Sequence, residues 1–281
     1  MTDSLRVVPD TDGERDAARA RRVTRPPLPS PRAAARVWAR NARVFSHIWK
    51  GALLPLFFDP LFYLVALGFG LGTYVATING VPYREFIAPG LTASAVMWAA
   101  SFETTWNAYY KMDESRQYDA VIATPVEPED LVLGEVAWAA TRALVYGTVF
   151  LVVVAALGLL SSWWAVALPP FLLLGGACFA ACGLAYTSLI PKMDYFTFYF
   201  TLFITPMFVF GGIFYPYDRL PDWAQGLAWL TPLYHLVNIA RDLATGPEAV
   251  AVAGNAAWLA VVTAALFFAV PARAMRRRLV A

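Results

Sequence analysis

Runs of about 20 apolar residues limit what this chain can fold into more than any other feature of its sequence. An α-helix of about that length crosses the hydrocarbon core of a bilayer. The composition agrees, because 59% of the residues are hydrophobic and 15% are charged, whereas a soluble domain carries about 25% charge. The sequence therefore predicts an all-α integral membrane protein. The six expected spans are residues 53–75, 86–109, 131–160, 164–190, 195–214 and 249–270.

The distribution of Lys and Arg predicts how these spans are oriented. Basic residues near span ends are more frequent on the cytoplasmic side of a membrane protein. Here eleven lie on one side and three on the other, so both termini are expected in the cytoplasm. The eleven are Arg36, Arg40, Arg43, Lys50, Lys111, Arg116, Lys192, Arg273, Arg276, Arg277 and Arg278, and the three are Arg84, Arg219 and Arg241.

Two segments precede the six-helix transmembrane domain, which we expect over residues 51–281. Residues 1–30 mix Arg, Asp and Pro and lack the apolar core of a signal peptide, so a disordered cytoplasmic tail is expected. Residues 31–50 place apolar side chains at helical spacing with basic residues between them. This pattern favours an amphipathic helix lying in the membrane interface, with a soluble cytosolic helix as the alternative.

The segment between the second and third spans, residues 110–130, is too polar to enter the membrane. Tyr118, Val121 and Ile122 form a small apolar face among charged residues. Pro125 ends the short helix, because the residue before a proline avoids the helical region. A short helix projected into the cytosol suits docking to a partner protein, and an ordinary solvated loop is the alternative.

Two charged residues lie inside expected spans. Glu103 and Arg142 are roughly 9 Å and 16 Å from the cytoplasmic span ends at about 1.5 Å per residue. A charge at the bilayer centre costs about 2.5–3.5 kcal/mol, so a partner is expected. Glu135 lies on the same helix face as Arg142 and nearer the cytosol. We expect these three residues to form an ion pair or a small network. Such a network could belong to a gate or a substrate path, or it could hold neighbouring spans together.

The fifth span is unusually aromatic. Eleven of the 23 residues from Tyr195 to Tyr217 carry rings, more than an interfacial belt requires. Residues 215–246 follow as two short apolar helices, which we expect to be re-entrant in the outer leaflet. The rings could face a substrate or pack against neighbouring spans. The candidates for the substrate path are Phe200, Phe203, Phe208 and Phe210.

Several kinds of site are not expected in this chain. No Lys follows Gly or precedes Ser or Thr, so the chain has no phosphate-binding P-loop. Cys178 and Cys182 lie one helical turn apart in an apolar run and are expected to be packing residues. The two His residues are far apart. We therefore expect no metal site, no cofactor, no nucleic-acid partner and no enzymatic activity in this chain.

Several ordered motifs carry a resemblance that covers about residues 35–280. They are "EFIAPGLTASAVMWAASFET", "DAVIATPVEPEDLVLGEVAWAATRA" and the set "DYFTFYFTLFITPM", "YPYDRLP" and "LTPLYHLVNIAR". The chain resembles the NodJ-type permeases, which are membrane subunits of type-2 ABC exporters. The Arg-rich N-terminal tail lies outside the resemblance, whereas Arg142 stands where this family is expected to have a basic residue.

The resemblance implies how the protein is assembled. It implies six spans, a bacterial plasma-membrane location, a second permease subunit that would make a homodimer, and two copies of a separate ATPase that binds Mg-ATP. Residues 31–50 match the connecting helix, residues 110–124 the coupling helix that docks on the ATPase, and residues 215–246 the re-entrant extracellular helices. The expected coupling residues are Lys111, Arg116, Tyr118, Asp119 and Thr124.

The resemblance also bounds the substrate. Members named for nodulation export lipo-chitooligosaccharides, and relatives export lipid-linked glycans, other lipids or drugs. The leading expectation is thus a permease for an amphipathic substrate, with membrane lipid as a partner, and a drug or antibiotic efflux permease is the alternative. A membrane-embedded transferase is disfavoured because the spans contain no cluster of Asp. An ion-coupled transporter is disfavoured because no inverted repeat is visible.

Overall fold

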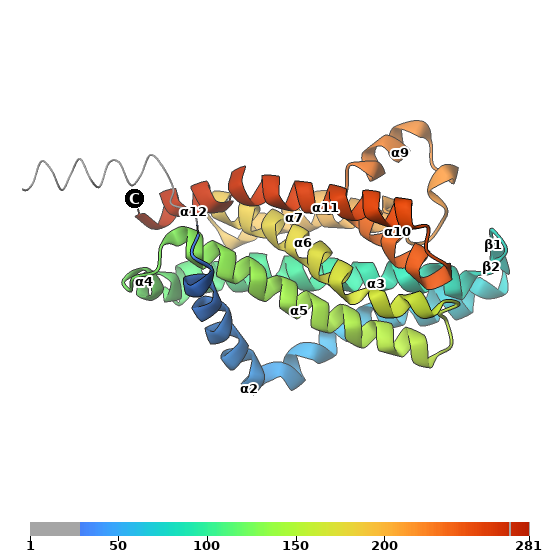
Figure 1. The fold of residues 1–281 in the computed structure, drawn as a ribbon, viewed down its shortest axis with the longest axis horizontal. Helices are drawn as coiled ribbons and strands as arrows, with labels where there is room; N and C mark the ends of the chain where they lie inside the picture. Colours follow the sequence, from blue (N-terminus) through green and yellow to red (C-terminus); the bar gives the residue numbers. More distant parts are fainter. Residues whose placement is uncertain (1–28, 270, 281) are drawn as a thin grey trace, which may run out of the picture.

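The protein forms an elongated bundle of helices, and the computed structural model describes residues 29–269 and 271–280. Most helices run along the long axis of the bundle (Figure 1). The expected tail at residues 1–30 lies outside the described residues, except for its last two positions. The elements are α2 (Pro31–Tyr63), η1 (Leu64–Gly70), η2 (Leu71–Thr73), β1 (Thr77–Ile78), β2 (Val81–Pro82), α3 (Tyr83–Phe102), η3 (Glu103–Asn107), η4 (Tyr110–Glu114), α4 (Gln117–Ile122), α5 (Pro128–Ala156), η5 (Trp163–Ala167), α6 (Pro169–Leu189), η6 (Met193–Tyr195), α7 (Phe196–Tyr199), η7 (Phe200–Ile204), α8 (Thr205–Phe210), η8 (Tyr217–Arg219), α9 (Asp222–Trp229), α10 (Pro232–Thr245), α11 (Ala249–Ala269) and α12 (Pro271–Val280).

Four helical segments of the described chain are long and apolar enough to cross a membrane. They match the expected third to sixth spans, and a shorter apolar segment, Phe58–Thr73, matches the first. The boundaries differ where backbone geometry ends a helix. Gly158 adopts a positive φ of 69° soon after α5, a conformation that favours glycine. The four long segments are Pro128–Ala156, Pro169–Leu189, Met193–Phe210 and Ala249–Leu279.

The core of the bundle lies where α3, α5 and α6 pack together. Most residues of α3 are buried, which places this helix inside the bundle. Helix α2 crosses the first part of α5 at Gly134. A Cβ atom there would lie 2.6 Å from Val37 Cβ and 2.8 Å from the Ala34 carbonyl oxygen. Glycine therefore permits the two helix backbones to approach closely.

The amphipathic segment and the first span are not separate helices. The structure joins residues 31–50 to the following residues in one helix, α2, whose ribbon turns sharply (Figure 1). Pro60 lies within α2, and a proline removes one hydrogen bond from the helical ladder. The π-helical turn η1 and the short 3₁₀ turn η2 then continue the chain towards the hairpin β1–β2.

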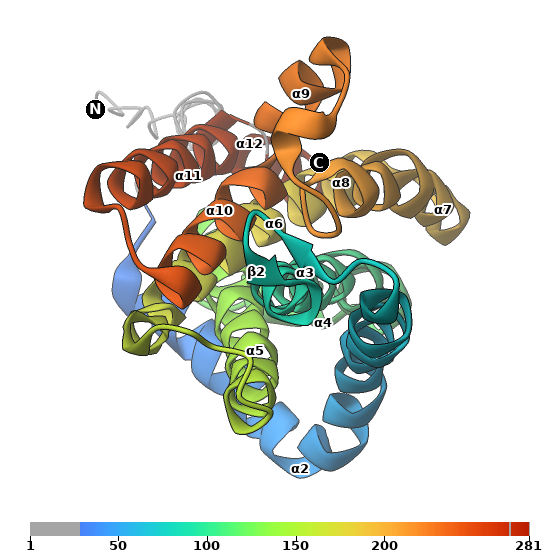
Figure 2. The same ribbon diagram turned by 90° about the vertical axis from the view of Figure 1, so that its right-hand side faces the viewer.

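The end of the bundle that carries the β1–β2 hairpin also carries the two short helices expected from the sequence (Figure 1). Helix α10 is capped by the Thr231 hydroxyl, which accepts from the Tyr234 backbone N–H at 3.4 Å, and ends before Gly246. Helix α10 is largely buried against α3, α6 and α11. Helix α9 stands out from the bundle when it is seen from this end (Figure 2).

Candidate functional site

The candidate site lies where α2, the end of α3 and the first part of α5 meet the polar segment before α4. Helix α3 continues into the π-helical turn η3, which begins at Glu103. Single π-helical turns often occur at functional sites. The turn is held against α6, because the Thr187 hydroxyl donates to the Thr104 carbonyl oxygen at 2.7 Å.

Glu103 is the centre of this site and its side chain is only 3% exposed. Arg142 forms an ion pair with it, and the Lys111 Nζ atom lies 3.1 Å from the Glu103 Oε1 atom. The Trp138 indole N–H donates to the same carboxylate at 2.9 Å, and the Asn107 amide donates at 2.7 Å. The pair of Glu103 and Arg142 expected from the sequence is therefore present.

Glu135 is the second buried carboxylate, and Lys111 joins it to the first. Lys111 Nζ lies 2.8 Å from Glu135 Oε2. Helix α2 supplies two more donors to Glu135, the Asn41 amide at 3.0 Å and the Arg40 guanidinium at 3.3 Å. We call Arg40, Glu103, Lys111, Glu135 and Arg142 the charge network. Two carboxylates face two largely buried cations, so the buried charge is paired, which is the condition for its tolerance.

Two of the expected coupling residues, Lys111 and Tyr118, face the interior of the bundle, so neither side chain is exposed to a partner in this structure. Burial alone would lower the pKa of Lys111, but the carboxylates of Glu135 and Glu103 raise it above the ordinary value, so this cation stays charged. Tyr118 is fully buried. Its burial raises the pKa of the hydroxyl well above the ordinary value, and the carboxylates of Glu135 and Glu103 raise it further. The physical reason is that α4 turns its apolar face towards the bundle.

The other three expected coupling residues are exposed. Arg116 and Asp119 form an ion pair at 3.7 Å with side chains 78% and 53% exposed. Arg116 has a φ of 49°, which turns the chain between η4 and α4. Thr124 donates from its hydroxyl to the Val121 carbonyl oxygen at 2.6 Å, which closes the end of α4. This exposed side of α4 is the part of the segment available to a partner.

A small cavity opens directly onto the charge network. It has a volume of about 240 Å³ and lies between α2 and the helical turns that follow α3. Glu103, Lys111 and Arg142 line its polar side, and Val44 and Ile48 of α2 line its apolar side. The site therefore combines paired charges with a space in which a polar group or water can lie beside them.

The four aromatic candidates of the fifth span lie in different environments. Phe200 stacks on Trp98 and Phe102 of α3, with ring centroids 5.7 Å and 4.8 Å apart. Phe203 is 37% exposed, and Phe210 is partly buried beside Trp223. Phe208 is 7% exposed and is enclosed by Tyr63, Trp98 and Phe214. Phe208 is therefore a packing residue in this conformation, which was the alternative to a place on the substrate path.

Comparison with known proteins identifies the family. The family model described as ABC-2 type transporter matches residues 34–244. The chain belongs to the ABC-2 type transporter family. Nodulation protein J of Rhizobium leguminosarum bv. trifolii is 38% identical over 244 residues, which are 86% of this chain and 92% of that protein. Nodulation protein J of Rhizobium meliloti (strain 1021) is 36% identical over the same shares. The inner membrane transport permease YadH of Escherichia coli (strain K12) is 26% identical over 72% of this chain and 78% of that protein.

Membership in the ABC-2 family makes this chain a membrane subunit of a transporter, and this family normally works with an ATP-binding subunit. The match covers the charge network, α4 and the aromatic fifth span. The resemblance to the NodJ-type permeases is confirmed by the relatives named nodulation protein J.

Sequence reasoning missed several members of the site. Asn107 and Lys111 follow Glu103 at four and eight residues, so helical spacing places all three on one face and was a usable signal. Arg40 and Asn41 of α2 reach Glu135 across more than 90 residues of sequence. No local pattern predicts that contact, because it depends on how α2 packs on α5.

Proposed function

We propose that this chain is the permease subunit of an ATP-driven exporter that carries an amphipathic substrate, a lipid, a lipo-oligosaccharide or a lipid-linked glycan, out of the cytoplasm or inner leaflet. It would work as a homodimer in the bacterial plasma membrane, with two copies of a separate ATPase that hydrolyses Mg-ATP. Each subunit would cross the membrane six times with both termini in the cytoplasm, and α9 and α10 would be the re-entrant helices.

The observation that carries the proposal is the aromatic surface shared by α3 and the fifth span. Only 28% of the residues in the apolar segment Met193–Phe210 are buried. Its exposed apolar side chains include Phe198, Leu202 and Phe203, at 56%, 70% and 37% exposure. The partly exposed rings of Trp98 and Phe200 stack beside them. Figure 2 places α7 and α8 on one flank of α3. Such a surface suits the apolar part of a substrate better than a small hydrophilic solute.

The charge network supplies a route from the ATPase to this surface. The exposed side of α4 would dock on the ATPase through Arg116 and Asp119. On the same segment, Lys111 is tied to Glu103 and Glu135. Glu103 lies on the helical run that carries Trp98. A displacement of α4 would therefore act on the end of α3, and we assign the network the role of holding these elements together.

The partner is tested first. The tagged full chain is purified from its native membranes, and co-purifying proteins are searched for a P-loop ATPase. Asp119→Lys is expected to lower recovery of the ATPase or stimulation of its hydrolysis at least tenfold, because it reverses a charge on the docking side. Asp218→Lys, an exposed site at the other end of the bundle, is the matched control. Equal recovery and stimulation with both variants would show that α4 is not the docking element.

The substrate class is tested with the same complex in proteoliposomes. Extracts containing lipids, lipo-oligosaccharides or lipid-linked glycans are expected to stimulate ATP hydrolysis, and free sugars and amino acids are not. Phe203→Ala is expected to weaken that stimulation and to leave basal hydrolysis unchanged. Stimulation by a small hydrophilic solute without any response to amphipathic compounds would overturn the proposed substrate class. A response limited to drug-like amphipathic compounds would favour the efflux alternative.

A further inference from the structure

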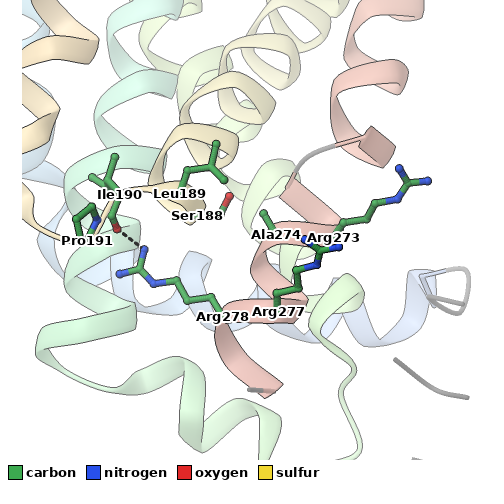
Figure 3. Close-up of a pocket in the computed structure, with 8 residues that line it drawn as sticks. All are labelled: Ser188, Leu189, Ile190, Pro191, Arg273, Ala274, Arg277 and Arg278. Atoms are coloured by element: carbon green, nitrogen blue, oxygen red, sulfur yellow. Dashed lines mark hydrogen bonds between the residues drawn. The ribbon is translucent and has the colours of Figure 1, made fainter. Parts of the chain in front are cut away.

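A pocket lined by arginines lies between the end of α6 and the C-terminal helix α12. Its volume is about 700 Å³. One wall is the chain from Ser188 to Pro191, and the other is the face of α12 that carries Arg273, Arg277 and Arg278 (Figure 3). The site is separate from the charge network and from the aromatic surface, and neither of those roles uses it.

Two of the four arginines of α12 are already engaged by the protein. Arg276 Nη1 lies 2.7 Å from the Glu129 carboxylate at the start of α5. Arg278 donates to the Ile190 and Thr187 carbonyl oxygens at 2.6 Å and 2.9 Å, and it lies 3.0 Å from the Asp113 carboxylate. Figure 3 shows Arg278 reaching towards Ile190. Arg278 thereby satisfies carbonyls at the C-terminus of α6, which have no partner inside their own helix.

The other two arginines, Arg273 and Arg277, have no such partner. Both are exposed, and no carboxylate of the described residues lies within 4.0 Å of either guanidinium. They are four residues apart on α12 and thus on one helix face, where like charges repel each other. A bound anion would relieve this repulsion. Guanidinium groups bind phosphate oxygens well because their donors match the geometry of the anion.

The position of the pocket indicates where the anion comes from. Arg278 contacts Asp113 of η4, so the pocket is at the same end of the bundle as α4. The apolar helix α11 ends at Ala269 and α12 begins at Pro271, which places the pocket near the end of an expected span. Leu189, Ile190 and Ala274 supply apolar walls, and Leu189 is 67% exposed. Basic pockets between helices on the cytoplasmic side bind the head groups of anionic lipids.

We infer that this pocket binds the phosphate of an anionic phospholipid of the cytoplasmic leaflet, with Arg273 and Arg277 as its charged ligands. The glycerol and upper acyl carbons would lie against the apolar wall from α6. The inference does not depend on the exported substrate or on the ATPase, because it concerns a lipid that binds the resting protein.

The test measures lipid binding to the full chain in neutral detergent by native mass spectrometry. Phosphatidylglycerol is titrated against the wild type, the double variant Arg273→Gln/Arg277→Gln and the control Arg84→Gln/Arg219→Gln. The control removes the same charge from exposed arginines elsewhere. The pocket variant is expected to bind phosphatidylglycerol about 30-fold more weakly, from about 1 kcal/mol per basic residue. The control and the binding of phosphatidylcholine are expected to remain unchanged.

Three results would overturn the inference. The first is equal phosphatidylglycerol affinity for the wild type and the pocket variant. The second is displacement of phosphatidylglycerol by inorganic phosphate at equal concentration, since the site would then bind a free anion. The third is a pocket variant that retains the lipid but no longer co-purifies with an ATPase, which would make the pocket a protein-docking surface. Monodisperse elution and an unchanged melting temperature establish that the variant is folded.

Discussion

Glu103→Gln is the sharpest perturbation of the charge network. Glutamine has nearly the volume of glutamate, so it removes a charge without opening a cavity. Trp138 and Asn107 donate to different oxygens of Glu103, so the single carbonyl oxygen of glutamine keeps one of these two hydrogen bonds. Lys111 keeps Glu135 as its partner. Arg142, whose side chain is 12% exposed, then has no carboxylate within 4.0 Å among the described residues. Breaking a buried pair from one side costs about 3–5 kcal/mol, and we expect a loss of that size in the free energy of unfolding.

The double variant Glu103→Gln/Arg142→Met tests whether the two residues stabilise the protein through their ion pair. It removes both charges and leaves Glu135 with Lys111 and Arg40. Since replacement of a whole buried pair by neutral groups is often close to neutral, we expect it to recover about 2 kcal/mol or more of the loss. The control is Asp119→Asn, which breaks an ion pair with exposed side chains. A surface pair contributes about 1 kcal/mol or less.

The assay is a double-mutant cycle on reversible unfolding of the full chain in mixed micelles. The coupling energy is the difference between the loss in the double variant and the sum of the two single losses. Independent sites add within about 0.5 kcal/mol. A coupling energy within that range would refute the reasoning, because it would mean that Glu103 and Arg142 do not stabilise each other in the folded protein.

Three further variants test the packing around the site. Gly134→Leu is expected to lower the melting temperature by many degrees because it separates α2 from α5, whereas Gly254→Leu, which meets open space, serves as its control and is expected to change little. Tyr118→Ala is expected to cost about 3–5 kcal/mol of unfolding free energy through a cavity, and Tyr118→Phe less than half of that; equal losses would contradict the interior position of the ring. Phe208→Ala is expected to destabilise the purified protein by a similar amount, whereas Phe203→Ala leaves its melting temperature unchanged, and the reverse order would place Phe208 on the open surface.

The long apolar segments and the buried ion pair could be predicted from the sequence. The segments follow from local runs of apolar residues, and the pair follows from the free-energy cost of an unpaired charge inside the membrane. Apolar runs give the four long apolar segments directly, and a charge such as Glu103 inside an expected span requires a partner. The nearest opposite charge on the neighbouring span is Arg142. The start of α10 at Pro232 is also visible in sequence, since proline is favoured in the first turn of a helix. Each of these predictions rests on residues close together in the chain or on one strong energetic constraint.

The direction in which each side chain faces could not be predicted in the same way. The segment 110–124 carries both buried and exposed residues, and the chain reverses at Arg116 through a positive φ. The spacing of Tyr118, Val121 and Ile122 predicts an apolar face of α4, but it does not tell whether that face packs on the bundle or on a partner protein. The same limit applies to Phe203 and Phe208, which are both phenylalanines of the fifth span. They differ in exposure because Tyr63 and Phe214 pack against Phe208.

The composition of the charge network bears on why it exists at all. A buried cluster of charges is often less stabilising than apolar residues of the same volume, so stability alone does not explain five charged groups at this junction. The network joins α2, the end of α3, α5 and the segment that leads to α4 through side chains rather than through continuous backbone. Ion pairs can exchange partners while the total charge stays balanced, and Lys111 already contacts both carboxylates. An apolar contact would hold these elements in one arrangement, whereas Lys111 has a charged partner on either side of it.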